Sequence, residues 1–267
     1  MESRRKPAGW RERRWPRSYG ETVGRVLSID LAYKKARDFG ICLIDKRKGQ
    51  PMKVEFIPPH ELIADPPEAD QCGRAIFEVC GKRRVRIVFL DGPQGWKDPR
   101  SPLPNSRHCE KLLATPGKTG TFGKSKPGNY EPFIEFAINV FARLVAHGGR
   151  LVSSVVVKAP RSGLLVAESF PSSAWRKLGI KPLPGKAKAK PRDTLDRLSK
   201  LQELFRFRAE REPTHDELQA LVAGMAGVAI LAGKPRGYCV QGCPPKRVGR
   251  LTVEGFIVNP CIEFLTM

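Results

Sequence analysis

The sequence has no hydrophobic run long enough to cross a membrane. Its longest unbroken stretch of apolar residues and glycine, 221–233, is shorter than the ~20 residues that a transmembrane helix needs. The basic N-terminal residues are not followed by the apolar segment of a secretory signal. We therefore expect no association with a membrane and a cytoplasmic location.

Cysteines are few and scattered, with seven in 267 residues. An odd number at irregular spacing argues against a disulfide framework, so we interpret them as reduced thiols. The closest pair, Cys239 and Cys243, would supply half of a zinc site, but no second paired spacing follows it. We interpret this pair as small, half-buried hydrophobic residues near a turn.

A phosphate-binding loop is also missing. Two Gly-Lys-Thr/Ser triplets, at 117–119 and 123–125, suggest such a loop at first sight. The earlier glycine that the motif requires is replaced by Leu112 in the first case and by Lys118 in the second. Neither triplet predicts a nucleotide cofactor, and we expect no small-molecule cofactor.

Positive charge is what the sequence has in excess, with 48 Lys and Arg against 27 Asp and Glu and a net charge of +21. Proteins that neutralise phosphates gain affinity by releasing counterions, so nucleic acid, either DNA or RNA, is the expected partner. Membrane-surface helices need a large apolar face, whereas the basic stretches here are rich in proline and glycine. A positive surface that only maintains solubility is the alternative.

The charge is unevenly distributed along the chain. Residues 1–22 mix Arg, Trp and Pro without periodicity, and we interpret them as a basic, flexible arm whose tryptophans stack on bases. A tail that is disordered or folds back is the alternative. Residues 23–267 predict one α/β domain with basic loop insertions near 97–128 and 181–191.

Hydrophobic periodicity predicts both strands and helices in this domain. The first three strands, separated by basic turns, suit an antiparallel meander. Thr214 and Glu217 have the spacing of a capping box at a helix start. The predicted strands are 24–32, 39–44, 53–57, 85–90, 151–157 and 164–168, with short edge strands at 237–240 and 254–260, and the predicted helices are 67–81, 132–146, 172–178, 193–210 and one after Thr214.

Acidic residues recur at strand ends within this basic chain. Asp30, Asp91 and Glu168 each close an apolar strand, and Asp216 opens a helix. Because strand ends meet loops at one edge of an open α/β sheet, such carboxylates converge on one point. Mg²⁺ prefers hard oxygen ligands, and two such ions can activate water and stabilise the leaving oxygen of a phosphodiester. The pattern therefore predicts nuclease chemistry.

The acidic residues also have structural interpretations. Asp91 precedes Gly-Pro and would then be a turn residue, and Glu168 would be a helix-entry acid. Asp30 would form an ion pair with Lys34 or Arg25.

The late helix start has two interpretations as well. Asp216 and Glu217 are expected there on capping and dipole grounds alone. His215 is interpreted either as a general acid or as a surface residue near the cap.

Six segments together carry a resemblance: 28–32, 89–95, 106–110, 168–175 with 178–179, 215–222 and 254–257. In their order and spacing the sequence resembles the DUF429 family of predicted nucleases. The resemblance implies an α/β, RNase H-like mixed sheet of three antiparallel strands followed by parallel strands, with helices on both faces. It also implies catalytic and metal-binding roles for Asp30, Asp91, Glu168 and Asp216, with Mg²⁺ or Mn²⁺ as cofactor.

The late helix departs from a related pattern. Holliday-junction resolvases of this superfamily carry two aspartates three residues apart before Ala-Leu, and here only Asp216 matches because the second position is Gln219. Residues three apart share a helix face, so Gln219 is expected where a second ligand would be. An amide is a weaker, neutral ligand, which leaves open whether the site binds two ions, one or none.

The sequence as a whole predicts a metal-dependent nuclease that hydrolyses phosphodiester bonds of DNA or RNA. A nucleic-acid-binding module of the same fold that has lost catalysis is the alternative, and a protein-interaction or phosphotransfer relative is a third. The basic residues expected to bind the nucleic-acid backbone are Lys34, Lys35, Arg107, Lys118, Lys124 and Lys126.

Overall fold

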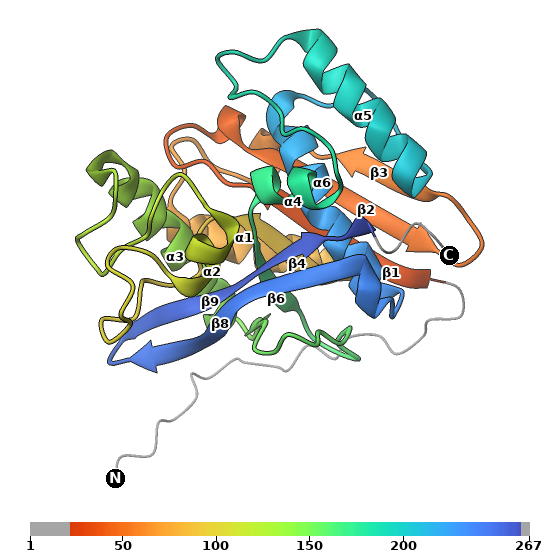
Figure 1. Cartoon of the computed structure of the whole chain (residues 1–267). Helices are drawn as coiled ribbons and strands as arrows, with labels where there is room; N and C mark the ends of the chain where they lie inside the picture. The colour runs from red at the N-terminus through yellow and green to blue at the C-terminus, as the bar shows by residue number, and fades with distance from the viewer. Residues whose placement is uncertain (1–21, 263–267) are drawn as a thin grey trace.

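A mixed sheet of nine strands forms the centre of the protein, in the order β7-β3-β2-β1-β4-β6-β9-β8 with β5 paired to β6 (Figure 1). The computed structural model describes residues 22–262, so the predicted arm, residues 1–22, lies outside the described residues except for Thr22. The strands are β1 Thr22–Asp30, β2 Gly40–Arg47, β3 Met52–Phe56, β4 Val85–Asp91, β5 Arg150–Leu151, β6 Leu165–Ser169, β7 Phe207–Ala209, β8 Tyr238–Val248 and β9 Leu251–Pro260.

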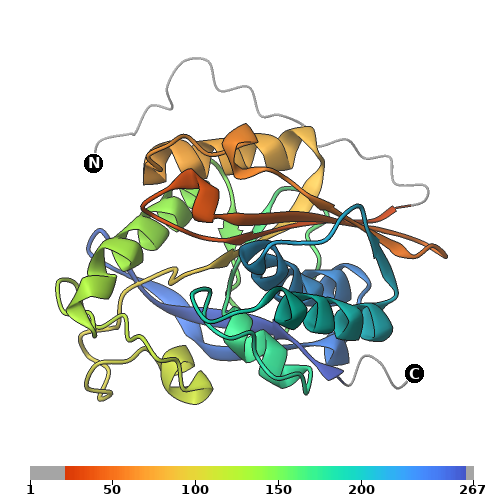
Figure 2. The same ribbon diagram turned by 90° about the horizontal axis from the view of Figure 1, so that it is seen from above.

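The strand pairing confirms the expected fold class. β1, β2 and β3 form an antiparallel meander, whereas β4 is parallel to β1 and β6 is parallel to β4. Helices cover both faces of the sheet, as Figure 2 shows. The chain therefore has an α/β fold with an RNase H-like mixed sheet, in which three antiparallel strands are followed by parallel strands.

The helices enclose two hydrophobic cores. α1 and α3 cover a core that contains Leu27 and Leu90, and α4, α5 and α6 cover a second core that contains Val26 and Phe89. Neighbouring residues such as Val26 and Leu27 belong to different cores because side chains alternate along a strand. The helices are α1 Ala69–Lys82, α2 His108–Leu113, α3 Glu131–Ala146, α4 Pro171–Lys177, α5 Pro191–Phe205 and α6 His215–Leu231.

The apolar helix α6 lies close against the sheet because glycines face it. A Cβ added at Gly224 would come within 2.9 Å of Ser28, and one at Gly227 would come within 2.8 Å of Val26 and Phe89. Both glycines therefore set how near α6 approaches β1. In residues 22–262 we find no helix whose length and apolar character would let it span a bilayer.

Three predicted elements differ from the structure. The strand predicted over 151–157 is reduced to β5, because the chain leaves the sheet after Leu151. The helix predicted to end at 210 ends at Phe205, because Arg206 has a left-handed backbone (φ 48°) and the following residues pair with β3 as β7. The expected short edge strands are a long β8–β9 hairpin, and β9 lies inside the sheet because it also pairs with β6.

The segment 97–128, expected as a basic insertion, connects β4 to α3 and contains α2. Backbone hydrogen bonds give it a defined shape: Lys97 N–H donates to the Gly120 carbonyl oxygen at 2.7 Å, and Lys118 and Lys126 exchange two bonds at 2.8 and 3.0 Å. The second expected insertion, 181–191, leads from α4 to α5.

Candidate active site

Asp30 and Asp91 lie side by side at the carboxyl ends of the two central parallel strands. β1 and β4 pair in register, so the two residues are Cα partners. Their carboxyl groups are hydrogen-bonded to each other, and both residues are partly exposed. The structure thus brings together two of the four predicted site residues.

Both carboxyl groups of this pair have raised pKa values. Burial, followed by the charge of Asp91, raises the pKa of Asp30 well above its usual range. Burial also raises the pKa of Asp91 to about 7, with a further contribution from Glu168, although the hydrogen bond from Asp30 acts in the opposite direction. Two carboxyl groups this close do not both ionise easily, so they share a proton near neutral pH.

The ion pairs considered for Asp30 are not formed. Arg25 binds Asp45 at 3.1 Å, and the Lys34 ammonium group lies 5.3 Å from the centre of the Tyr33 ring. The structure therefore gives Asp30 a second carboxyl group, and not a basic side chain, as its hydrogen-bond partner.

Asp216 reaches the same edge of the sheet from α6. The Cα partner of Asp30 on β2 is Gly40, and a Cβ added to Gly40 would lie 2.0 Å from the carbonyl oxygen of Asp216. A glycine at this position therefore allows the first turn of α6 to approach β1. The charge of Asp216 is near enough to contribute to the raised pKa of Asp30.

Lys186 and His215 hold the carboxylate of Asp216. Lys186 Nζ lies 2.5 Å from Oδ2, and His215 Nδ1 lies 3.0 Å from Oδ1. Burial opposes the effect, but the hydrogen bonds from His215 and Lys186 lower the pKa of Asp216. The hydrogen bond to Asp216 in turn raises the pKa of His215, whose Nε2 atom lies 2.9 Å from the Pro184 carbonyl oxygen. His215 is thus fixed beside Asp216.

The Lys186 ammonium group shows that this corner of the molecule accepts a cation. Its side chain is 53% exposed and also binds Asp38 at 3.0 Å. Its charge lowers the pKa of Asp30, against the larger upward contributions. This one basic side chain therefore supplies positive charge to three aspartates, Asp216, Asp38 and Asp30.

Glu168 lies one strand further along the sheet but faces the other side. Its Cα partner on β4 is Leu90, whereas Asp91 is paired with Ser169. Because side chains alternate along a strand, Glu168 points towards the face covered by α1 and α3. The Asp30–Asp91 pair points towards α6.

Arg107 neutralises Glu168 inside the protein. Its Nη1 and Nη2 atoms donate to the two carboxylate oxygens at 2.8 and 2.5 Å, and the backbone N–H of Gln94 donates at 2.9 Å. The side chains of Arg107 and Glu168 are only 2% and 3% exposed. Arg107 was expected to bind the nucleic-acid backbone, but the structure places its guanidinium group away from the surface.

The same arginine ties β6 to the segment 97–128. Arg107 Nε donates to Glu110 at 2.9 Å, and Glu110 accepts the backbone N–H of Thr119 at 3.2 Å. Sequence reasoning missed this network. The spacing of Arg107 and Glu110 at the start of α2, where Glu110 accepts the Arg107 N–H at 3.1 Å, is the one sequence signal that could have indicated it.

Two polar residues of α6, Gln219 and Glu217, form hydrogen bonds with other parts of the protein. Gln219 Oε1 accepts a hydrogen bond from Trp175 Nε1 at 2.7 Å, so this oxygen is already committed to α4. Glu217 accepts the Thr214 N–H at 2.8 Å and pairs with Arg211 at 2.6 Å. The capping interpretation is confirmed for Glu217.

Asp30 and Asp91 are the candidate ligands for a divalent ion. Within residues 22–262 no group of three or more His, Cys, Asp or Glu side chains is arranged to hold one. Two adjacent carboxyl groups that are partly exposed and free of ion pairs are the hard oxygen donors that Mg²⁺ and Mn²⁺ prefer. Asp30 and Asp91 therefore fit such an ion, and Asp216 would join them only by exchanging Lys186.

The other predicted nucleic-acid-binding residues lie nearer the surface. Lys34 and Lys35 are exposed in the loop after β1, and Lys124 and Lys126 are exposed in the segment 97–128. Lys118 is half-buried and donates to the Thr115 carbonyl oxygen.

An exposed aromatic ring accompanies these lysines. Phe122 is 58% exposed and packs edge-on against the buried Trp96, with ring centres 5.2 Å apart. An exposed ring flanked by lysines is the combination on which single-stranded nucleic acid stacks. Phe122 was not identified from the sequence.

Comparison with known proteins gives a distant likeness. No family model and no curated protein matches the sequence, so the resemblance to DUF429 stays a prediction. RuvC from Thermus thermophilus is similar with a TM-score of 0.39 and 10% identity, over 79% of this chain and 97% of that chain. T. thermophilus RuvC in complex with Holliday junction substrate gives 0.36 and 11% over the same shares. The strand pairing, and not this likeness, establishes the fold.

Proposed function

We propose that this protein is a metal-dependent nuclease that hydrolyses phosphodiester bonds of DNA or RNA. The observation that carries the proposal is the Asp30–Asp91 pair, two adjacent carboxyl groups with raised pKa values at the carboxyl edge of the sheet, in a chain of net charge +21. Carboxyl groups with raised pKa values and no ion pair are costly to the fold and are typical of functional sites.

Asp30 and Asp91 would hold Mg²⁺ or Mn²⁺. Such an ion, when bound, supplies a polarised water and stabilises charge on the leaving oxygen. Asp216 would be a third ligand if Lys186 were bound to Asp38 alone, and His215 keeps the Asp216 carboxylate oriented. Glu168, also predicted as a ligand, would reach an ion only by releasing Arg107, and otherwise acts by raising the pKa of Asp91.

The surface around the pair would bind the substrate backbone. Lys34 and Lys35 follow Asp30 by a few residues and are exposed, and Lys118, Lys124 and Lys126 lie within four residues of the exposed Phe122 in the sequence. Contacts of this kind attract phosphates through charge and bases through stacking, without reading sequence. Cleavage and binding are therefore both expected to weaken as salt is raised.

The experiment is a cleavage assay with single-stranded, duplex, hybrid and branched substrates in Mg²⁺ or Mn²⁺, with and without a chelator. We expect Asp30→Asn to lower cleavage by ~100-fold or more, since metal affinity depends strongly on each ligand. Asp196→Asn, on the exposed surface of α5, is the matched control and should leave cleavage unchanged. A panel with no cleavage that depends on Asp30 and on the ion would refute the nuclease.

A nucleic-acid-binding module without catalysis is the second candidate, and Gln219 favours it. The oxygen that would supply a further ligand on α6 is bound to Trp175 instead. The two candidates differ in a melting experiment, because a ligand that binds only the folded state stabilises it by ~2.7 kcal/mol at 100 times its Kd. The module predicts salt-sensitive nucleic-acid binding with no Mg²⁺-dependent rise in Tm, whereas the nuclease predicts a rise that Asp30→Asn abolishes.

A further inference from the structure

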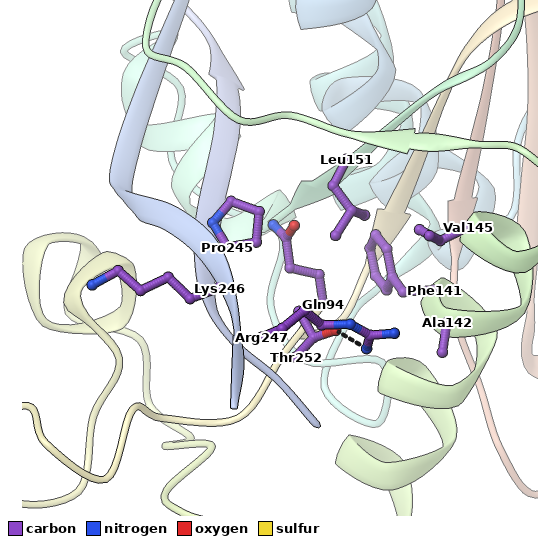
Figure 3. Close-up of a pocket in the computed structure, with 9 residues that line it drawn as sticks. All are labelled: Gln94, Phe141, Ala142, Val145, Leu151, Pro245, Lys246, Arg247 and Thr252. Carbon is purple, nitrogen blue, oxygen red and sulfur yellow. Dashed lines mark hydrogen bonds between the residues drawn. The ribbon is translucent and has the colours of Figure 1, made fainter. Parts of the chain in front are cut away.

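A cavity of about 200 Å³ opens between α3, β5 and the β8–β9 hairpin (Figure 3). Its walls are largely apolar and include Phe141 and Val145 of α3, Leu151 of β5 and Pro245 of β8. Sites for drug-sized ligands usually span ~300 to 1,000 Å³, so this one has room for a single flat ring system. None of the carboxylates described above lines it.

Gln94 brings an unpaired hydrogen-bond acceptor into this cavity. The residue is 1% exposed, and its Nε2 atom donates to the Phe256 carbonyl oxygen at 2.8 Å. Its Oε1 atom has no hydrogen-bond partner. Figure 3 shows this amide between Pro245 on one side and Leu151 and Phe141 on the other. Buried acceptors are nearly always paired, so this oxygen calls for an N–H donor from a ligand.

The position of this amide is built into the fold. Gly255 of β9 has a left-handed backbone (φ 136°), and a Cβ there would lie 2.5 Å from Gln94 Cδ. The absence of a side chain at Gly255 therefore leaves the space that the Gln94 side chain occupies against β9. With its Nε2 atom held by Phe256, the amide is fixed, and its unpaired oxygen lies on the side of Leu151 in Figure 3.

Two basic side chains stand at the rim. Lys246 and Arg247 line the cavity from β8 and are both exposed. Arg247 Nη1 donates to Thr252 Oγ1 at 3.1 Å and to the Arg250 carbonyl oxygen at 3.3 Å, which holds its guanidinium group in place. Their charge suits a phosphate outside the cavity.

A flat apolar slot, one inward acceptor and two cations at the mouth match a nucleotide. We propose that the cavity binds an unpaired nucleobase of a nucleic-acid strand, with Gln94 Oε1 accepting an N–H of the base and Lys246 and Arg247 facing the adjoining phosphates. The inference rests on the proposed function and names its substrate class. A base inside a duplex cannot enter such a slot without leaving the stack, so the substrate is single-stranded or locally unpaired.

Gln94 connects the cavity to the loop that follows Asp91. Gln94 follows Asp91 by three residues, and its backbone N–H donates to Glu168 while its side chain reaches the cavity. A base held by Gln94 is therefore anchored on the same loop that leaves β4 after Asp91. This arrangement makes the base slot part of substrate positioning.

The test uses the full chain without divalent ion, so that binding is separate from cleavage. A short single-stranded DNA with one 2-aminopurine is titrated with protein, and quenching of its fluorescence reports stacking. Ala142→Phe adds a ring at an exposed position on the cavity wall, and Ser199→Phe adds the same ring at an exposed position on α5. We expect equal quenching in the wild type and in Ser199→Phe, and weaker quenching in Ala142→Phe.

Gln94→Met tests the acceptor separately, because it keeps the length of the side chain and removes the oxygen. We expect affinity for the strand to fall about tenfold, in line with the loss of one good hydrogen bond to a base. Melting curves of each variant show that it is folded. Unchanged affinity in a folded Gln94→Met variant would overturn the role of Gln94.

The outcomes separate this inference from the nuclease itself. Equal quenching in the wild type and in Ala142→Phe overturns the base slot, even when the chain cleaves nucleic acid. If Ala142→Phe reduces quenching but the wild-type protein cleaves no substrate, the base-binding cavity is supported and the nuclease is refuted. The protein is then the nucleic-acid-binding module. A parallel titration with adenosine monophosphate distinguishes a free nucleotide: binding of this mononucleotide without quenching in the strand overturns the assignment to a polymer.

Discussion

The acidic residues at the strand ends of the central sheet form two groups that differ in how their negative charge is balanced. In the described part of the chain Asp30 and Asp91 form no ion pair and share a proton, whereas Glu168 is bound by Arg107 on the opposite face. All three close an apolar strand in the same way. The difference shows that the side of the pleat on which an acid falls, and the cation it meets there, decide whether it is available to a ligand.

The largest effect on stability is expected from a substitution at Arg107, which neutralises Glu168. We expect Arg107→Met to lower the free energy of unfolding by ~3 to 5 kcal/mol, because it leaves Glu168 and Glu110 buried without their cation. Urea unfolding at pH 7 measures this. Arg74→Met, which removes an exposed pair with Glu78, is the control and should change the free energy by no more than ~1 kcal/mol. A similarly small loss for Arg107→Met would contradict the network.

A substitution at Gly40 would disturb the packing of α6 beside Asp30. A Cβ at this position would meet the Asp216 carbonyl oxygen at 2.0 Å, so Gly40→Ala must displace α6. We expect a loss of ~1 to 3 kcal/mol in unfolding free energy. Gly81→Ala, in α1 with nothing within 4 Å of the added atom, should instead stabilise by ~0.5 to 1 kcal/mol. Equal effects of the two substitutions would show that α6 tolerates the displacement.

The shared proton makes the stability of the protein depend on pH. Because the pKa values of Asp30 and Asp91 are raised in the folded state, their contribution is fully present below ~4 and is lost as the pH rises through about 7. We expect Asp30→Asn to raise Tm at pH 8 by a few degrees and to flatten this pH dependence.

Glu168→Gln tests the difference between Glu168, which is in an ion pair, and Asp30, which is not. It breaks an ion pair and should lower Tm throughout pH 5 to 8, in the opposite direction to Asp30→Asn. Calorimetry without divalent ions follows both variants. Parallel pH profiles for the wild type and Asp30→Asn would mean that the pair carries no extra proton.

The smallest effect is expected at Lys186. Its side chain is 53% exposed, so Lys186→Met should lower stability by less than ~1 kcal/mol. Removing this cation leaves the Asp216 carboxylate free for an added one, and we expect Mg²⁺ to raise Tm more in the variant than in the wild type. Lys188→Met, an exposed neighbour on the same segment, is the control. A smaller Mg²⁺ effect in Lys186→Met than in Lys188→Met would show that Lys186 assists the ion.

Local patterns were sufficient for much of the fold. The meander of β1 to β3, the helices α1 and α3, and the cap formed by Thr214 and Glu217 were predicted, because periodicity and capping depend on residues close in sequence. The adjacency of Asp30 and Asp91 was also expected, since acids at the ends of neighbouring strands share one edge.

Other features depend on partners far away in the sequence. β7 forms because β3 offers it an edge, and β9 is buried because it pairs with β6. Neither pairing leaves a signal in the short segment itself. The periodicity that predicted a helix to 210 was therefore overridden by tertiary pairing.

By itself, the sequence determined the basic character of the protein, the order of its main elements and the acids at its strand ends. Only the tertiary structure decided which of those acids meet. Strand register turned Glu168 towards Arg107, and packing of α4 against α6 bound Gln219 to Trp175. The physical reason is that a shift of one residue in a strand reverses the face of a side chain, and register is set by contacts between segments distant in sequence.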